Sequence, residues 1–248
     1  MAFDRALMQS FLDGRFQRRF GAGSCLWRFY GWEPFAVTIG YNQDISTIDG
    51  QRCRQEGIDV VRRPTGGRAV FHADEFTYSF LAETEERNAL IYRMVHEMIM
   101  LALQELGIRS EFCRSTPGES RSKGSPVTCF TASARYELQV NGRKLVGSAQ
   151  RRSRNILLQH GSLPLTGKHK DIARLVASPD ESEDRAIRVE MERKTVSLQE
   201  LLGYIPPYGM LAELMRQASF LQSGIGMTML DYGDLEALLQ TAAAPSTS

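Results

Sequence analysis

An Asn-Gly pair between two segments of alternating apolar and polar residues is the feature that most narrows the possible folds of this chain. The segments are 135–140 (RYELQV) and 143–150 (RKLVGSAQ), on either side of Asn141-Gly142. Asn-Gly favours the tight two-residue turn that joins antiparallel strands. A third strand-like segment, 154–165 (RNILLQHGSLPL), follows directly. Three consecutive strands predict a sheet at the centre of the fold.

The remaining segments alternate between predicted helices and strands. Apolar spacing predicts helices over 3–13, 47–56 and 86–106, with Gly57 and Gly107 ending the second and third. Strands are predicted over 25–32, 35–41, 58–63, 69–72 and 76–82. Beyond residue 168 the pattern is helical and includes a capping box formed by Ser197 and Glu200. The sequence therefore predicts a single α/β (α+β) domain with mixed and antiparallel sheets flanked by helices.

Charge and hydropathy argue against several classes of function. The 30 Lys and Arg residues are balanced by 29 Asp and Glu residues, so no overall field attracts nucleic acid. The longest apolar run, 98–103, is far shorter than the roughly 18 residues of a membrane span, and no secretory signal precedes the first helix. The four cysteines lack C-x-x-C spacing, which disfavours zinc and a disulfide framework. We expect a reduced, cytoplasmic protein with no metal and no nucleic-acid or membrane partner.

The segment 62–68 (RRPTGGR) lies between two predicted strands and admits three interpretations. It is a tight connection, a phosphate-binding loop, or one wall of a pocket for a long, thin ligand. Gly66 and Gly67 could adopt positive φ, and the arginines Arg62, Arg63 and Arg68 could bind an anion. The segment lacks the spacing of a P-loop or of a dinucleotide-binding motif. From these residues alone, a plain loop with solvated arginines is the better interpretation.

Cys129 is the candidate nucleophile, because it follows a long polar segment (113–128) and precedes the Asn-Gly hairpin. A reactive thiol needs a nearby cation or base, and Lys144 on the second hairpin strand is a candidate. The alternatives are a small buried side chain for Cys129 and an exposed strand position for Lys144, and for Lys144 the spacing alone favours the exposed position. His72 and His160, at strand ends, are either bases or satisfied core histidines. The basic segment 151–155 is interpreted as a solvated hairpin tip.

Several segments together resemble the lipoate–protein ligase and octanoyltransferase superfamily. The signature block is 62–80 (RRPTGGRAVFHADEFTYSF), and 142–150 (GRKLVGSAQ) and 156–165 (ILLQHGSLPL) resemble the second and third blocks. The segments 1–8 (MAFDRALM) and 28–45 (RFYGWEPFAVTIGYNQDI) also fit. The chain departs from the family pattern at Ala73, since Asp74 comes one place later than usual. The resemblance implies a biotin/lipoyl protein ligase-like catalytic domain over 1–248, with a core at 1–165, a helical part at 168–242 and a frayed tail at 243–248.

Within the superfamily, 129–138 (CFTASARYEL) resembles the LipM-type octanoyltransferases. The resemblance implies that Cys129 is the nucleophile and that Lys144 lowers its pKa, with no cofactor required. It implies acyl carrier protein as the octanoyl donor, and a lipoyl domain or the glycine-cleavage H protein as the acceptor. The residues that it implies for substrate binding are Arg63, Thr65, Gly66, Gly67, Arg68, Ala69, His72, Tyr78, Gly147, Ser148, Ala149, His160, Gly161 and Ser162.

Three alternative functions stay open at this point. An ATP-dependent lipoate–protein ligase keeps the lysine but lacks the nucleophilic cysteine. A lipoyl amidotransferase, which moves the acyl group between lipoyl domains, uses the same cysteine chemistry. A non-enzymatic protein that only binds lipoyl domains needs neither Cys129 nor Lys144. The presence of both residues therefore favours a transferase.

Overall fold

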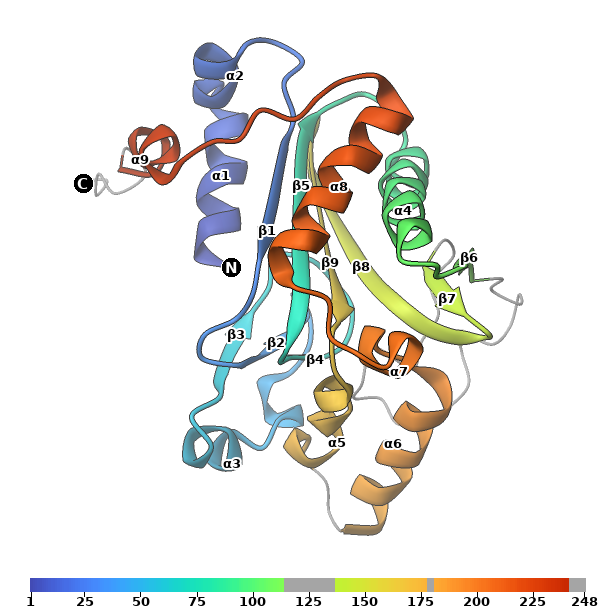
Figure 1. The fold of residues 1–248 in the computed structure, drawn as a ribbon. Coiled ribbons are helices and arrows are strands. Elements are labelled where there is room, and N and C mark those ends of the chain that lie inside the picture. The colour runs from blue at the N-terminus through green and yellow to red at the C-terminus, as the bar shows by residue number, and fades with distance from the viewer. Residues whose placement is uncertain (114–136, 178–180, 241–248) are drawn as a thin grey trace, which may run out of the picture.

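The computed structural model describes residues 1–113, 137–177 and 181–240, with no account of side chains at 181 and 237–240. Cys129 and nearly all of the polar segment before it lie outside the described residues. No helix among the described residues is long and apolar enough to cross a membrane. The described chain forms two sheets with helices packed around them (Figure 1).

The larger sheet has six antiparallel strands in the order β1-β5-β9-β8-β7-β6. Their bounds are β1 Leu26–Tyr30, β5 Glu75–Glu83, β9 Ile156–Pro164, β8 Arg143–Ser153, β7 Leu138–Val140 and β6 Glu111–Phe112. Asn141 and Gly142 have φ of 50° and 74° and join β7 to β8, as the sequence predicted. β6 was not predicted, because a two-residue strand carries no pattern of its own.

The smaller sheet has the order β3-β2-β4 and is mixed, as predicted. Its strands are β2 Ala36–Ile39, β3 Asp59–Arg62 and β4 Val70–His72; β2 pairs with β3 in parallel and with β4 antiparallel. The 62–68 segment leaves β3 and returns into β4. Thr65 contacts His160 of β9 and the Pro64 carbonyl accepts from Arg151 of β8, so the segment lies where the two sheets approach each other.

Helices cover both faces of the larger sheet. Their bounds are α1 Ala2–Leu12, α2 Arg15–Phe20, α3 Gly50–Gln55, α4 Asn88–Glu105, α5 Ile172–Leu175, α6 Glu181–Lys194, α7 Leu198–Leu202, α8 Tyr208–Ser223 and α9 Tyr232–Gln240, with 3₁₀ turns η1 Ile45–Thr47 and η3 Gly167–Asp171. Phe76, Tyr78 and Phe80 of β5 point to α4 and α8, while Leu81 packs with α1. Since successive strand residues face opposite sides, β5 is buried along almost its whole length. Figure 1 shows α4 and α8 side by side.

The helical C-terminal part is attached to both sheets. Buried residues of α5 and α6 pack with the smaller sheet. The Val196 N–H donates to the Lys144 carbonyl at 3.0 Å, where the chain between α6 and α7 runs beside β8. The predicted capping box at Ser197 and Glu200 is present.

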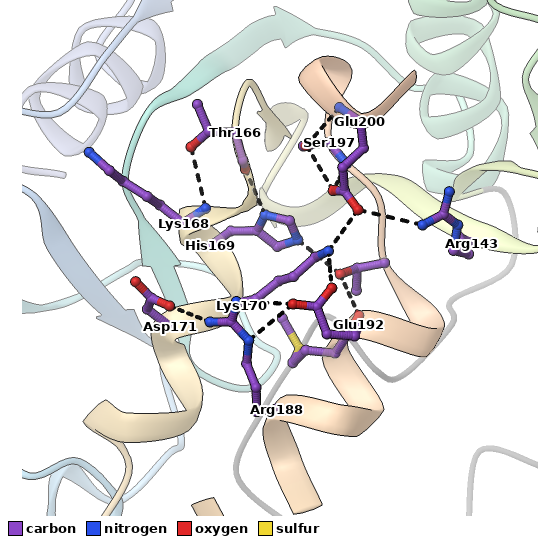
Figure 2. A network of polar contacts seen from close by, with 12 residues as sticks. Arg143, Thr166, Lys168, His169, Lys170, Asp171, Arg188, Glu192, Ser197 and Glu200 are labelled. Carbon is purple, nitrogen blue, oxygen red and sulfur yellow. Dashed lines mark hydrogen bonds and ion pairs between the residues drawn. The ribbon is translucent and has the colours of Figure 1, made fainter. Parts of the chain in front are cut away.

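A buried cation, Lys170 of η3, ties these elements together (Figure 2). Its Nζ donates to Glu192 Oε2 of α6 at 2.5 Å and to Glu200 Oε1 of α7 at 2.8 Å. Glu200 also lies 3.5 Å from Arg143 of β8, and Glu192 is bound by Arg188. The network therefore links η3, both helices and the strand that carries Lys144.

The basic segment 151–155 is not a solvated hairpin tip. Its first three residues extend β8, and the turn is at Arg154-Asn155. Arg152 donates to the Asn88 side chain at 2.7 Å and to the carbonyls of Thr84 and Glu86 at 2.5 Å. The pairing of β8 with β9 up to Ser153–Ile156 overrides the local turn signal.

Candidate active site

A cavity lies between the smaller sheet and strands β8 and β9 of the larger one. Its lining residues are Met1, Tyr30, Thr38, Arg63, Val70, His72, Thr77, Glu137, Lys144, Gly147, Ser148, Ala149, His160, Gly161 and Ser162. Of the residues implied for catalysis or substrate binding, this group contains Arg63, His72, Lys144, Gly147, Ser148, Ala149, His160, Gly161 and Ser162. The three sequence blocks therefore meet around one hollow.

The register of β8 against β9 sets one wall of the cavity. Gly147 pairs with Ser162, and Ser148 pairs with Gly161. A Cβ at Gly161 would lie 2.3 Å from Ser148 Oγ and 2.5 Å from Tyr78 Cε1, so only glycine fits there. The wall is close-packed because this residue has no side chain.

Lys144 is buried and paired, not an exposed strand lysine. Its Nζ donates to Glu137 Oε1 at 2.7 Å, and the two side chains are 6% and 5% exposed. Glu137 was not predicted as a site residue; the only signal was that it is an acidic residue inside the first predicted hairpin strand, 135–140. A buried ion pair of this kind fixes the lysine charge at the cavity wall.

His160 connects the cavity to the first helix. Its Nε2 lies 2.6 Å from Thr65 Oγ1, and its Nδ1 faces Asp4 Oδ2 at 3.9 Å. Burial lowers the pKa of His160, so the ring is neutral near pH 7. Burial alone would raise the pKa of Asp4, but His160 and Arg28 lower it well below its usual range. An ionised Asp4 favours the proton on Nδ1, which leaves Nε2 to accept from the Thr65 hydroxyl.

His72 is held by a second buried carboxylate. Its Nδ1 donates to Glu75 Oε1 at 2.7 Å, and its Nε2 lies 2.8 Å from Thr38 Oγ1. Ser162 Oγ donates to the other Glu75 oxygen at 2.5 Å. Burial opposes ionisation of Glu75, but His72 and these hydrogen bonds lower its pKa overall. The ring also stacks on Trp32, with centroids 4.4 Å apart.

Tyr78 lies behind the cavity wall and does not line it. Gln159 Nε2 donates to the Tyr78 hydroxyl at 2.9 Å, and that hydroxyl lies 2.6 Å from Ser148 Oγ. Burial raises the pKa of Tyr78 strongly, so its O–H is retained and can donate to Ser148. His96 Nε2 lies 2.8 Å from the same Ser148 oxygen. Tyr78 and His96 thus orient a cavity serine, and His96 was missed because its helical spacing matches a core position.

Arg63 organises the loop in which it lies. Its guanidinium donates to the carbonyls of Thr38 at 3.0 Å, Gly66 at 2.8 Å and Arg68 at 2.6 Å. These acceptors are backbone carbonyls, so Arg63 fixes the conformation of the loop from within. Within this loop, Thr65, Gly66, Gly67, Arg68 and Ala69 do not line the cavity, and their substrate-binding role stays a prediction.

Of the paired glycines Gly66 and Gly67, Gly67 has a backbone conformation that favours glycine. Gly67 has φ of 96°, and a Cβ at Gly40 would lie only 1.8 Å from the Gly67 carbonyl oxygen. The loop is therefore closed against β2 by direct backbone contact. Asp74, displaced by one position from the family pattern, pairs with Lys168 at 2.9 Å and anchors η3.

Among the described residues, no cluster of three or more His, Cys, Asp or Glu side chains could hold a metal ion. The polar groups described above are paired with one another. The chemistry that the described cavity offers is therefore that of two fixed cations, Lys144 and Arg63, beside a wall of glycine, alanine and hydrogen-bonded polar groups.

The fold is that of the lipoate–protein ligases. A bipartite lipoate protein ligase from Thermoplasma acidophilum matches with a TM-score of 0.73 at 19% identity, over 97% of this chain and 84% of that chain. A lipoate-protein ligase A bound with ATP matches with a TM-score of 0.70 at 20% identity, over 97% and 86%. At such identities the likeness defines the class of fold alone.

Sequence comparison identifies the family. Residues 1–219 match the model of the lipoyl protein ligase A/B catalytic domain, and the chain belongs to this family. Octanoyltransferase LipM of Moorella thermoacetica is 34% identical over 220 residues, covering 86% of this chain and 77% of the relative. Octanoyltransferase LipM of Geobacillus kaustophilus is 35% identical over 211 residues, covering 81% and 73%. The resemblance inferred from the sequence blocks is confirmed.

Proposed function

We propose that this protein is an octanoyltransferase of lipoate biosynthesis, which moves an octanoyl group from acyl carrier protein to a lysine of a lipoyl domain or H protein. The observation that carries the proposal is the similarity to LipM octanoyltransferases over most of the chain. The buried Lys144 at the wall of the cavity supports it, because a thiol nucleophile needs a fixed cation nearby.

In the proposed reaction, the Cys129 thiolate attacks the carbonyl carbon of the octanoyl thioester. The tetrahedral intermediate collapses, the carrier thiolate leaves, and octanoyl-Cys129 forms. The neutral amine of the acceptor lysine then attacks this second thioester, gives a proton to water, and displaces the Cys129 thiolate as the amide forms. The first exchange is nearly balanced, and amide formation drives the second. Neither step consumes ATP.

Lys144 has two tasks in this mechanism. Its positive charge favours the thiolate over the thiol of Cys129, and each unit by which the pKa falls corresponds to about 1.4 kcal/mol. Glu137 holds the Lys144 side chain in place through its ion pair, and its negative charge partly offsets the positive charge of Lys144. The lysine is thus a fixed electrostatic element, and backbone N–H groups near Gly147–Ala149 are candidates to stabilise the oxyanion.

The cavity wall suits an alkyl chain because its polar side chains are hydrogen-bonded to other residues of the same chain. His72 is hydrogen-bonded to Glu75 and Thr38, His160 to Thr65, and Ser162 to Glu75. An eight-carbon chain in such surroundings gains about 0.8 kcal/mol for each buried methylene. This wall favours an acyl group over a polar substrate.

The first test is the intact mass of the protein after mixing with octanoyl-acyl carrier protein, without ATP. We expect a gain of one octanoyl group that hydroxylamine removes and that Cys129→Ala abolishes. Lys144→Ala should slow acylation and shift thiol alkylation to higher pH. Undiminished transfer by Cys129→Ala would refute the thioester mechanism. If octanoate and ATP are required instead, the protein is a ligase.

A further inference from the structure

A second hollow lies directly beside the cavity and is built differently. It encloses about 430 Å³ between α1, the loop around Pro64 and the far end of β8. Arg63 lines both hollows, so they share a wall. We refer to the second hollow as the arginine groove, after Arg5, Arg62 and Arg151, which line it from these three elements.

One face of β8 runs from the cavity into the arginine groove. Residues two apart in a strand point to the same side, and Gly147, Ala149, Arg151 and Ser153 therefore form one row. The first two line the cavity, and the last two line the groove. At about 3.3 Å per residue, Ala149 and Arg151 are about 7 Å apart. The same face of β8 therefore borders both hollows.

The three guanidinium groups are held in place by neutral acceptors. Arg5 donates to the carbonyl of Arg62 at 2.5 Å, and Arg62 donates to the carbonyl of Gly40 at 2.8 Å. Arg151 donates to the carbonyl of Pro64 at 2.8 Å. Carbonyl acceptors fix the position of a guanidinium without neutralising its charge.

The arginine groove therefore keeps a local positive charge in a chain whose overall net charge is only +1. No ion pair joins Arg5, Arg62 or Arg151 to a carboxylate within the described ranges. The pKa of Asp44, an exposed carboxylate, is lowered mainly by hydrogen bonds from Ser46 and to a smaller extent by the positive charge of Arg62. Planar guanidinium groups bind phosphate with matched geometry.

Building on the proposed function, we propose that the arginine groove binds the phosphodiester of the prosthetic arm that carries octanoyl on acyl carrier protein. That arm has an anionic phosphodiester near the protein and the thioester at its far end. With the phosphate in the groove, the arm follows β8 past Ala149 and presents the thioester to the cavity. The groove is large enough to hold many water molecules, and it therefore admits a phosphodiester with chain on both sides.

The test compares two small donors that differ only in the phosphate: octanoyl-phosphopantetheine and octanoyl-pantetheine, alongside octanoyl-acyl carrier protein. The variant is Arg5→Gln/Arg151→Gln, which leaves the cavity residues unchanged. The control is Arg109→Gln/Arg193→Gln, which removes two exposed charges elsewhere. Transfer to a lipoyl domain is measured over a range of donor concentrations and of salt.

We expect the groove variant to raise KM for both phosphate-bearing donors by about tenfold, corresponding to about 1.4 kcal/mol. Its kcat/KM with octanoyl-pantetheine should stay that of the wild type, and its salt dependence with acyl carrier protein should weaken. The control variant should match the wild type with every donor.

Three results would overturn the inference: an unchanged KM for the phosphate-bearing donors, an equal loss with all three donors, or a raised KM for the lipoyl domain alone. The last result would assign the groove to the acceptor. Failure of the proposed function is seen separately, because the wild type would then transfer octanoyl from none of the donors.

Discussion

The network around Lys170 allows a prediction in which the two sides of an ion pair behave differently (Figure 2). The Lys170 side chain is 3% exposed, whereas its partners Glu192 and Glu200 are 46% and 30% exposed. The lysine depends on the glutamates for its solvation. The glutamates retain water, and each keeps an arginine partner when the lysine is removed.

The loss in the free energy of unfolding depends on whether a substitution leaves a buried charge without a counter-charge. Lys170→Met removes the buried charge and keeps most of the side-chain volume, so the free energy of unfolding should fall by no more than about 1 kcal/mol. The double variant Glu192→Gln/Glu200→Gln keeps the shape and the hydrogen-bonding capacity of the capping box. It leaves Lys170 buried without a counter-charge, and we expect a loss of about 3 to 5 kcal/mol.

Urea unfolding followed by circular dichroism measures both values at pH 7. Glu85→Gln/Glu105→Gln, which removes two exposed carboxylates at a distance from the network, is the control and should lie within about 0.5 kcal/mol of the wild type. Equal destabilisation by Lys170→Met and by the glutamate variant would refute the reasoning. It would mean that the pair itself, and not the burial of the lysine, stabilises this region.

Three further predictions rest on single contacts. Burial lowers the pKa of His169 to about 4, so the folded protein resists protonation that the unfolded chain accepts below pH 6.5. The free energy of unfolding should therefore fall by about 3 kcal/mol between pH 6.5 and pH 4 in urea titrations, and by less in His169→Asn. Gly161→Ala should cost about 1 to 3 kcal/mol through overpacking, while Gly66→Ala, with open space around it, should unfold like the wild type in a thermal melt. Asp4→Asn should destabilise by about 3 kcal/mol in urea at pH 7, because Arg28 loses its buried partner; a change below about 1 kcal/mol would contradict this.

The parts of the fold that follow from local chemistry were predictable. Asn141-Gly142 specifies its turn, and Ser197 with Glu200 specifies a helix start, independently of the rest of the molecule. The short helix α2 was missed because its start depends on Gly14 at φ of 73° and has no side-chain cap, whereas the equally short α3 is capped by Asp49. Such short elements take their stability from tertiary packing, and sequence periodicity does not report it.

The sequence predicted which segments form the candidate site, but not which side chains contact one another within it. Spacing alone favoured an exposed Lys144, and its burial depends on Glu137 across the hairpin. Asp4 and His96 reach the site from helices whose apolar pattern marks them only as core-forming. Pairing between distant segments sets these roles, and no single segment carries the information.

The packing at Gly161 limits where this chain can accept an insertion or a deletion. Ser148 lies opposite Gly161, and the space that glycine leaves is filled by that serine and by Tyr78. One extra residue in β9 before Gly161 would place a side chain where none fits, and one extra residue in β8 before Ala149 would turn Ala149 away from the cavity. In this chain we therefore expect insertions along the paired stretch of β8 and β9 to disrupt the site, and a longer Arg154-Asn155 turn to leave it in place.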